Sequence, residues 1–252
     1  RPAECAQVWA WIRIRANRDP KRTLLTSTAE EAAPELEYPP EWEPLENRPS
    51  LRGIPDVIAF CVAVPAGIVL AANAQTQLGM ICAIVFAAGL ALMLGMSGIY
   101  HTIHWGPERF AFFSRCDYAS IYVMIGGSYT PFCLCTDLAY RKELLVMVWA
   151  GVILGVLLTM FRPHGSRALR AGLYVVLGVA LLPNVANYYS AVPREVFVLT
   201  FMGGVFYILG AVVYVMKWPN PIPKHYAHHE VFHLFVFLGA IAHYIAIWKI
   251  VT

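Results

Sequence analysis

Charged residues are scarce in this chain of 252 residues: Asp, Glu, Lys and Arg together make up 14%, and hydrophobic residues make up 58%. Soluble domains average about 25% charged and about 45–50% apolar residues. The composition therefore argues against a soluble globular domain and points to a protein embedded in a membrane. The formal net charge is only +3 at pH 7, and we expect no nucleic-acid partner.

Two other signals are missing. The chain has no alternation of apolar and polar residues typical of strands, and no internal repeat. Its six cysteines lack the spacing of zinc fingers, and a disulfide between Cys133 and Cys135 would be strained. We interpret the cysteines as small apolar packing residues.

Long apolar stretches recur from residue 54 to the C-terminus. Each is close to the roughly 20 residues that a helix needs to cross the hydrocarbon core. The sequence predicts an all-α membrane protein, a bundle of seven transmembrane helices. The predicted spans are 54–73, 78–103, 113–135, 143–161, 168–189, 194–217 and 227–250.

The N-terminal segment has a different character. Seven glutamates fall between Glu30 and Glu46, with several prolines among them. Such a stretch is extended and polar rather than a domain core. We predict a largely irregular polar tail over residues 1–50 and a membrane domain over residues 51–252.

The distribution of basic residues predicts the orientation. Fifteen lysines and arginines fall in the tail and in the loops on its side of the membrane, and four fall on the opposite side. Basic residues are enriched in cytoplasmic loops. We therefore expect a cytoplasmic N-terminus and an external C-terminus, in a multi-pass plasma-membrane protein.

Ionisable residues inside the predicted spans gather at the cytoplasmic end. His101 lies near the end of the second span, Asp117 near the start of the third, and His229 and His233 at the start of the seventh. Ser97 lies four residues before His101 and so shares its helix face. Because ionisable groups are costly in a membrane, each needs a partner or a function.

This set is typical of a catalytic zinc site. His229 and His233 can chelate one metal from one helix face, and three imidazoles plus a water form a common catalytic zinc shell. A carboxylate such as Asp117 can hold the water or accept its proton, and Ser97 can orient the water or an oxyanion. The alternative is that these histidines are interfacial residues bonded to loop backbone. His225 can compete as a ligand, whereas His243 lies about 21 Å along the helix from His229, too far to share the metal.

Three motifs resemble the bacterial hemolysin III proteins, which share a seven-helix family with the adiponectin and progestin receptors. They are "SGIYHTIHWGPE", "CDYASIYVMIGGSYTPF" and "KWPNPIPKHYAHHEVFHLF", and the resemblance covers about residues 47–250. It implies that His101, His229 and His233 are zinc ligands. It also implies that Asp117 contacts the zinc-bound water and that Ser97 belongs to the same constellation.

The chain departs from the family pattern at two positions. Tyr118 stands where bacterial members often have His, and Arg52 stands where many have a Thr-His pair. The wider superfamily includes alkaline ceramidases, which hydrolyse ceramide amides at such a zinc site. We therefore expect either a zinc-dependent hydrolase of a lipid amide or ester, or a lipid-sensing receptor or membrane regulator with a structural zinc. A transporter is the third possibility. Whether the protein is an enzyme stays open at this point.

Overall fold

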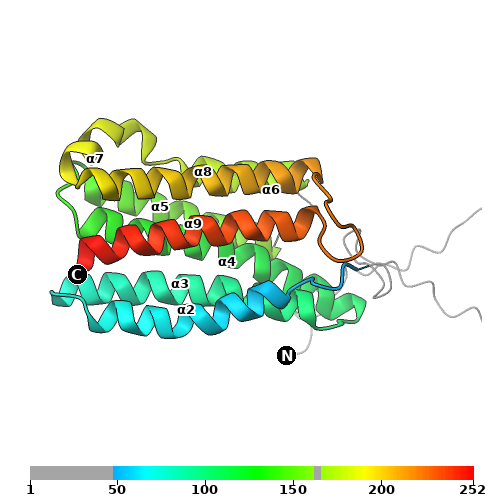
Figure 1. The fold of residues 1–252 in the computed structure, drawn as a ribbon. Coiled ribbons are helices and arrows are strands. Elements are labelled where there is room, and N and C mark those ends of the chain that lie inside the picture. The colour runs from blue at the N-terminus through cyan, green and yellow to red at the C-terminus, as the bar shows by residue number, and fades with distance from the viewer. Residues whose placement is uncertain (1–47, 162–165) are drawn as a thin grey trace, which may run out of the picture. The chain divides into compact units, whose positions relative to one another are not determined.

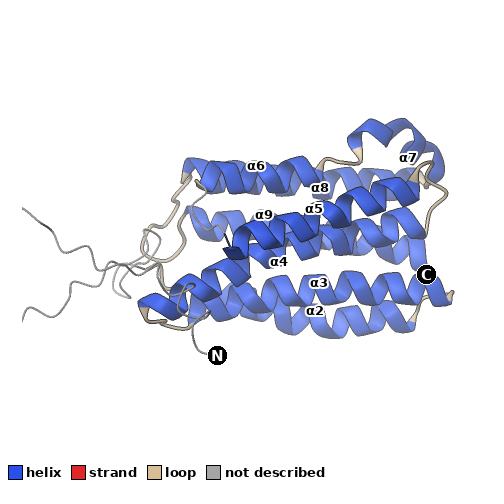
Figure 2. Cartoon of the chain, turned by 180° about the vertical axis from the view of Figure 1, so that it is seen from behind, coloured by secondary structure: helices blue, strands red, loops and turns tan. Residues whose placement is uncertain are grey.

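The computed structural model describes residues 48–161 and 166–252, which belong to one compact unit. The predicted tail over residues 1–50 lies almost wholly outside the described residues. The described part consists of helices joined by loops (Figure 2). The helices are α2 (Ile54–Ala72), α3 (Gln77–Thr102), α4 (Pro107–Leu134), α5 (Arg141–Phe161), α6 (Arg167–Gly178), the 3₁₀ turn η2 (Leu182–Asn184), α7 (Val185–Ala191), α8 (Arg194–Met216) and α9 (His228–Val251).

Local sequence signals set several helix ends. Thr76 caps α3 by accepting a hydrogen bond from the Gly79 N–H, and Ser166 caps α6 in the same way from Leu169. Pro107 occupies the first turn of α4, where its missing N–H costs nothing, so α4 begins six residues before the predicted position 113. The predicted fifth span is broken, because Pro183 lies in a 3₁₀ turn between α6 and α7.

Six segments are long and apolar enough to cross a membrane, judged by length and composition. They are α2, α3, α5, the segment Ala168–Ala191 that contains α6 to α7, α8 and α9. Helix α4 is also long enough, with 28 residues, but it is more polar. It packs against α3, α5, α6 and α9, so its polar residues have protein neighbours rather than lipid. The all-helical membrane bundle is confirmed.

The packing order brings distant segments to one end of the bundle. Helix α9 packs against α8, α3, α4 and α2. Figure 1 shows that α2 and α9 begin at the same end of the bundle, where α3 and α8 finish, and that the C-terminus lies at the opposite end. The second predicted span therefore ends at the same end of the bundle at which the first and seventh spans begin.

Candidate metal centre

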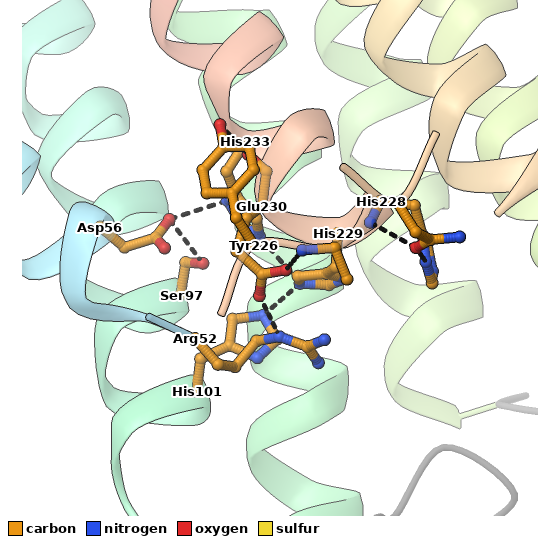
Figure 3. A network of polar contacts seen from close by, with 11 residues as sticks. Arg52, Asp56, Ser97, His101, Tyr226, His228, His229, Glu230 and His233 are labelled. Carbon is orange, nitrogen blue, oxygen red and sulfur yellow. Dashed lines mark hydrogen bonds and ion pairs between the residues drawn. The ribbon is translucent and has the colours of Figure 1, made fainter. Parts of the chain in front are cut away.

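Three histidine side chains from two helices converge at this end of the bundle (Figure 3). His101 comes from the last turn of α3, and His229 and His233 come from the first two turns of α9. The Nε2 atom of His229 lies 3.0 Å from Nε2 of His101 and 2.9 Å from Nε2 of His233. One ligand atom from each histidine lies within 4.8 Å of the other two, so the three residues can hold a metal ion.

Asp56 fixes the orientation of one of these rings. The Nδ1–H of His233 donates to the Asp56 carboxylate over 2.8 Å, and the Ser97 hydroxyl donates to the same oxygen over 3.0 Å (Figure 3). Both side chains of the His233–Asp56 pair are nearly buried. With its proton on Nδ1, His233 directs the Nε2 lone pair toward the other two histidines. A carboxylate behind a histidine in this way is a recurring arrangement at zinc sites, where it sets the tautomer and raises the basicity of the ligand.

The donor set fits zinc. Three neutral imidazoles with Zn–N bonds of about 2.0–2.1 Å would place their nitrogens about 3.3 Å apart in tetrahedral geometry. The two separations of 3.0 Å and 2.9 Å are slightly shorter than that value, so small side-chain shifts suffice to seat an ion. Three protein ligands leave one position for a water or a substrate, which is the pattern of catalytic rather than structural zinc sites.

The predicted carboxylate Asp117 lies on α4 and is 8% exposed. It lines the same cavity as Asp56, His229 and His233, and so stands at the site without being one of the three clustered ligands. Ser97 donates its hydroxyl hydrogen to Asp56, and its role in orienting a water or an oxyanion stays a prediction. Its position on the face of His101 agrees with the spacing of four residues.

Asp56 is the residue that sequence reasoning missed. It is a carboxylate in the first turn of the apolar helix α2, which begins at the same end of the bundle as α9 (Figure 1), and it is bonded to His233. Its side chain is buried, with 2% exposure. A charged residue in that position is the signal that could have identified it.

Three other histidines have partners outside the cluster. His225, the possible competitor, has its Nδ1 2.7 Å from the Ser50 hydroxyl, and the ring of His228 contacts the Asn220 amide oxygen. His243 has its Nε2 3.1 Å from the backbone oxygen of Thr200. None of these three belongs to the cluster found among the described residues.

The segment before α2 is bonded to the start of α9. Arg52 donates to the Glu230 carboxylate, whose other oxygen accepts the Ala227 N–H at the beginning of the helix (Figure 3). Burial and the Glu230 carboxylate raise the pKa of the Tyr226 phenol, which donates to the Glu230 backbone oxygen. Arg52, one of the two departures from the family pattern, thus helps to hold the helix turn that carries His229.

Gly53 allows the segment before α2 to approach the end of α3 closely. Its φ angle of 81° lies in the left-handed region, which other residues adopt only with strain. A Cβ at this position would lie 2.7 Å from the Cβ of His101. Glycine therefore lets the chain turn tightly beside His101 into α2, where Asp56 follows three residues later.

The cluster opens on an internal cavity of about 310 Å³. Asp56, Ser97, Asp117, His229 and His233 line one end of it, and the rest of the wall is mostly apolar or aromatic. Helix α6 contributes Arg170, whose guanidinium lies 4.5 Å from the centre of the Tyr118 ring. A largely apolar cavity of this size, with a few polar groups gathered at one end, is typical of a small-molecule site.

The sequence of this chain matches one known protein family and several known proteins. The family described as "Haemolysin-III related" matches residues 46–244. The chain belongs to this family. It is 29% identical to a hemolysin-3 homologue of Bacillus subtilis (strain 168) over 191 residues, covering 73% of this chain and 85% of that protein. It is 26% identical to hemolysin-3 of Bacillus cereus over 189 residues, covering 73% of this chain and 82% of that protein.

One relative of this haemolysin-III protein is named as a receptor. The chain is 28% identical to an adiponectin receptor protein of Drosophila melanogaster over 182 residues, covering 64% of this chain and 41% of that protein. The matched family region contains all three histidines as well as Asp56, Ser97 and Asp117. Together with the apolar helices, these relatives identify a multi-pass membrane protein, and the Bacillus relatives favour the bacterial cytoplasmic membrane.

Proposed function

We propose that this haemolysin-III protein is a zinc-dependent hydrolase that cleaves an amide or ester bond of a membrane lipid. The observation that carries the proposal is the convergence of three histidine nitrogens at one end of an apolar cavity. A site with three histidine ligands and one open position suits catalysis better than a closed structural shell.

His101, His229 and His233 would hold the metal. When bound, zinc lowers the pKa of a coordinated water to about 7 and polarises a carbonyl oxygen. The three imidazoles must be neutral to act as ligands, so the metal's charge is not compensated by these residues. Carboxylates are therefore expected close by, and Asp56 and Asp117 both line the cavity.

The two carboxylates would have separate tasks. Asp56 holds the Nδ1–H of His233 and keeps that ring in the metal-binding tautomer. Asp117 comes from α4, a helix that supplies no histidine to the site, and would accept a proton from the attacking water. Ser97 supports Asp56 from α3 through its hydrogen bond.

The apolar, exposed wall residues of the cavity favour a lipid as the substrate. Its wall includes Val205 and Ile208 on α8 and Leu182 in η2, three apolar residues that are well exposed. Exposed apolar side chains on a transmembrane helix face lipid. The cavity thus reaches the bundle surface beside these residues, where an acyl chain can enter from the bilayer without crossing water.

A receptor or regulator with a structural metal is the alternative. It is favoured by the position of the site between helices, since a metal there would tie α3 to α9, and Asp56 on α2 is bonded to His233 and Ser97 beside it. The similarity to a protein named as an adiponectin receptor agrees with it. This alternative predicts stability that depends on the metal, with no turnover.

The test is lipid hydrolysis by the purified, zinc-loaded protein in detergent. A long-chain ceramide and a matched ester are supplied, and the released fatty acid is measured by mass spectrometry. Wild type and His225→Ala should release fatty acid, because His225 is bonded outside the cluster. His233→Ala should release none, because it removes one of the three candidate ligands. Equal release by wild type and His233→Ala would overturn the hydrolase. Absence of release by wild type, with zinc-dependent thermal stability, would favour the receptor.

A further inference from the structure

Two polar atoms deep in the bundle have no hydrogen-bond partner among the described residues. They are Nδ1 of His243 on α9 and the hydroxyl of Tyr207 on α8. Both residues line the cavity that opens from the histidine cluster. Buried polar groups in proteins are nearly always paired, so two unpaired atoms on one cavity wall call for an explanation.

The hydrogen bond of His243 determines whether its unpaired nitrogen is a donor or an acceptor. Nε2 lies 3.1 Å from the backbone oxygen of Thr200, which can only accept, so Nε2 carries the proton. In a neutral imidazole Nδ1 is then an acceptor. The Tyr207 hydroxyl can donate or accept. An acceptor and a donor on neighbouring rings together suit a hydroxyl, which donates to one and accepts from the other.

Two glycines seat these rings side by side. A Cβ at Gly203 on α8 would lie 2.3 Å from Cδ2 of His243, and a Cβ at Gly239 on α9 would lie 2.7 Å from Cε1 of Tyr207. Each ring thus occupies the space that a side chain on the facing helix would need. The two ring centres are 5.3 Å apart in an edge-to-face arrangement, so the two residues lie at one level of the cavity that both line.

We propose that His243 and Tyr207 form a second polar subsite in the cavity, which binds a hydroxyl group carried partway along the hydrocarbon chain of the lipid. This inference rests on the proposed function, because it assumes that a lipid occupies the cavity with its head at the histidine cluster. It narrows the ligand class from any long-chain lipid to one with a mid-chain hydroxyl.

The register of α9 sets the position of that hydroxyl. His243 follows His233 by ten residues, or about 15 Å along the helix. The walls between them are apolar or aromatic and include Phe132, Phe201 and Val236. The two polar ends are therefore separated by a stretch that accepts only hydrocarbon, and a hydroxyl close to the head group would not reach the subsite.

Binding of saturated fatty acids of equal length to the zinc-loaded full chain in detergent tests the subsite. Three probes are compared: one without a hydroxyl, one with a mid-chain hydroxyl and one with a hydroxyl next to the carboxyl. Wild type should bind the mid-chain hydroxy acid about tenfold more tightly than the other two, the typical effect of one net hydrogen bond. Tyr207→Phe should reduce this preference to about threefold, because one of the two hydrogen bonds is lost and the His243 acceptor remains, with unchanged affinity for the plain acid.

Tyr207→Phe is a clean variant because it deletes only a hydroxyl that has no partner in the protein. Tyr129→Phe is the matched control. Tyr129 lines the same cavity, but its hydroxyl already donates to Gly178 and accepts from Leu181, so its loss should leave the tenfold preference intact.

The possible results separate the two proposals. Binding of the plain acid without preference for the mid-chain hydroxyl would overturn the subsite, since a trapped water would then satisfy the two atoms, and would leave the lipid cavity standing. An undiminished tenfold preference in Tyr207→Phe would also overturn the subsite. Failure of wild type to bind any of the three acids would overturn both the subsite and the lipid cavity on which it rests.

Discussion

His233 on α9 donates its Nδ1–H to the Asp56 carboxylate on α2 over 2.8 Å. This bond links the first predicted span to the last and leaves Nε2 of His233 free to face His229, 2.9 Å away. The geometry assigns Asp56 the role of a positioning residue that sets the tautomer of a metal ligand.

Loss of the Asp56 charge should weaken metal binding without abolishing it. Asp56→Asn and Asp56→Ala should lower zinc affinity by about 10–100-fold, with the alanine at the larger end, because the amide oxygen can still accept the Nδ1–H. Zinc competition with a chelator measures the affinity. Asp137→Asn, which alters an exposed carboxylate on a different loop, should have no effect. Equal zinc affinity in Asp56→Ala and wild type would show that the pair does not support the site.

Asp117→Asn should keep the metal and lose hydrolysis. The amide can still hydrogen-bond a water but cannot accept its proton, and Asp117 is not one of the three clustered ligands. Zinc content and fatty-acid release should be measured on the same preparation. A variant that purified without zinc would make Asp117 a metal ligand, and one with full turnover would remove it from the mechanism.

Gly203→Ala should destabilise the bundle, because the added methyl would lie 2.3 Å from the His243 ring. Overpacking of this kind costs about 1–3 kcal/mol. The neighbouring Gly204→Ala is the matched control: nothing lies within 4 Å of its Cβ position, so the change should be neutral or slightly stabilising. Thermal unfolding in detergent compares the two, and similar melting temperatures would argue against tight seating of His243.

The orientation predicted from the charge count is also testable. A reporter fused after Thr252 should be active only if it functions outside the cytoplasm, and one fused after Trp105, in the loop between α3 and α4, should show the opposite behaviour. Cytoplasmic activity of the Thr252 fusion would reverse the topology and place the histidine cluster at the external end.

Much of the fold follows from the sequence because apolar length is a strong signal. The second predicted span, 78–103, corresponds to α3 at Gln77–Thr102, and the seventh, 227–250, to α9 at His228–Val251. The start of α4 was placed too late, since its first turn carries polar residues that hydropathy alone assigns to a loop. The predicted fifth span, 168–189, is interrupted at Pro183, where a 3₁₀ turn depends on packing that the sequence does not reveal.

The cluster of His101, His229 and His233 could be predicted because a spacing of four on one helix and a shared membrane depth are both readable from the sequence. The partners of Asp56 and Ser97 could not, since they depend on how α2 and α3 rotate about their axes against α9. The unpaired atoms of His243 and Tyr207 could not be predicted for the same reason, because whether a buried side chain finds a hydrogen-bond partner depends on the packing between helices.

Metal analysis of the purified protein tests the central claim most directly. Wild type and His225→Ala should each carry about one zinc per chain, and His101→Ala, His229→Ala and His233→Ala should each lose most of it, because three ligands become two. Wild type without bound metal after zinc loading, or full zinc retention in any of the three cluster variants, would contradict the account.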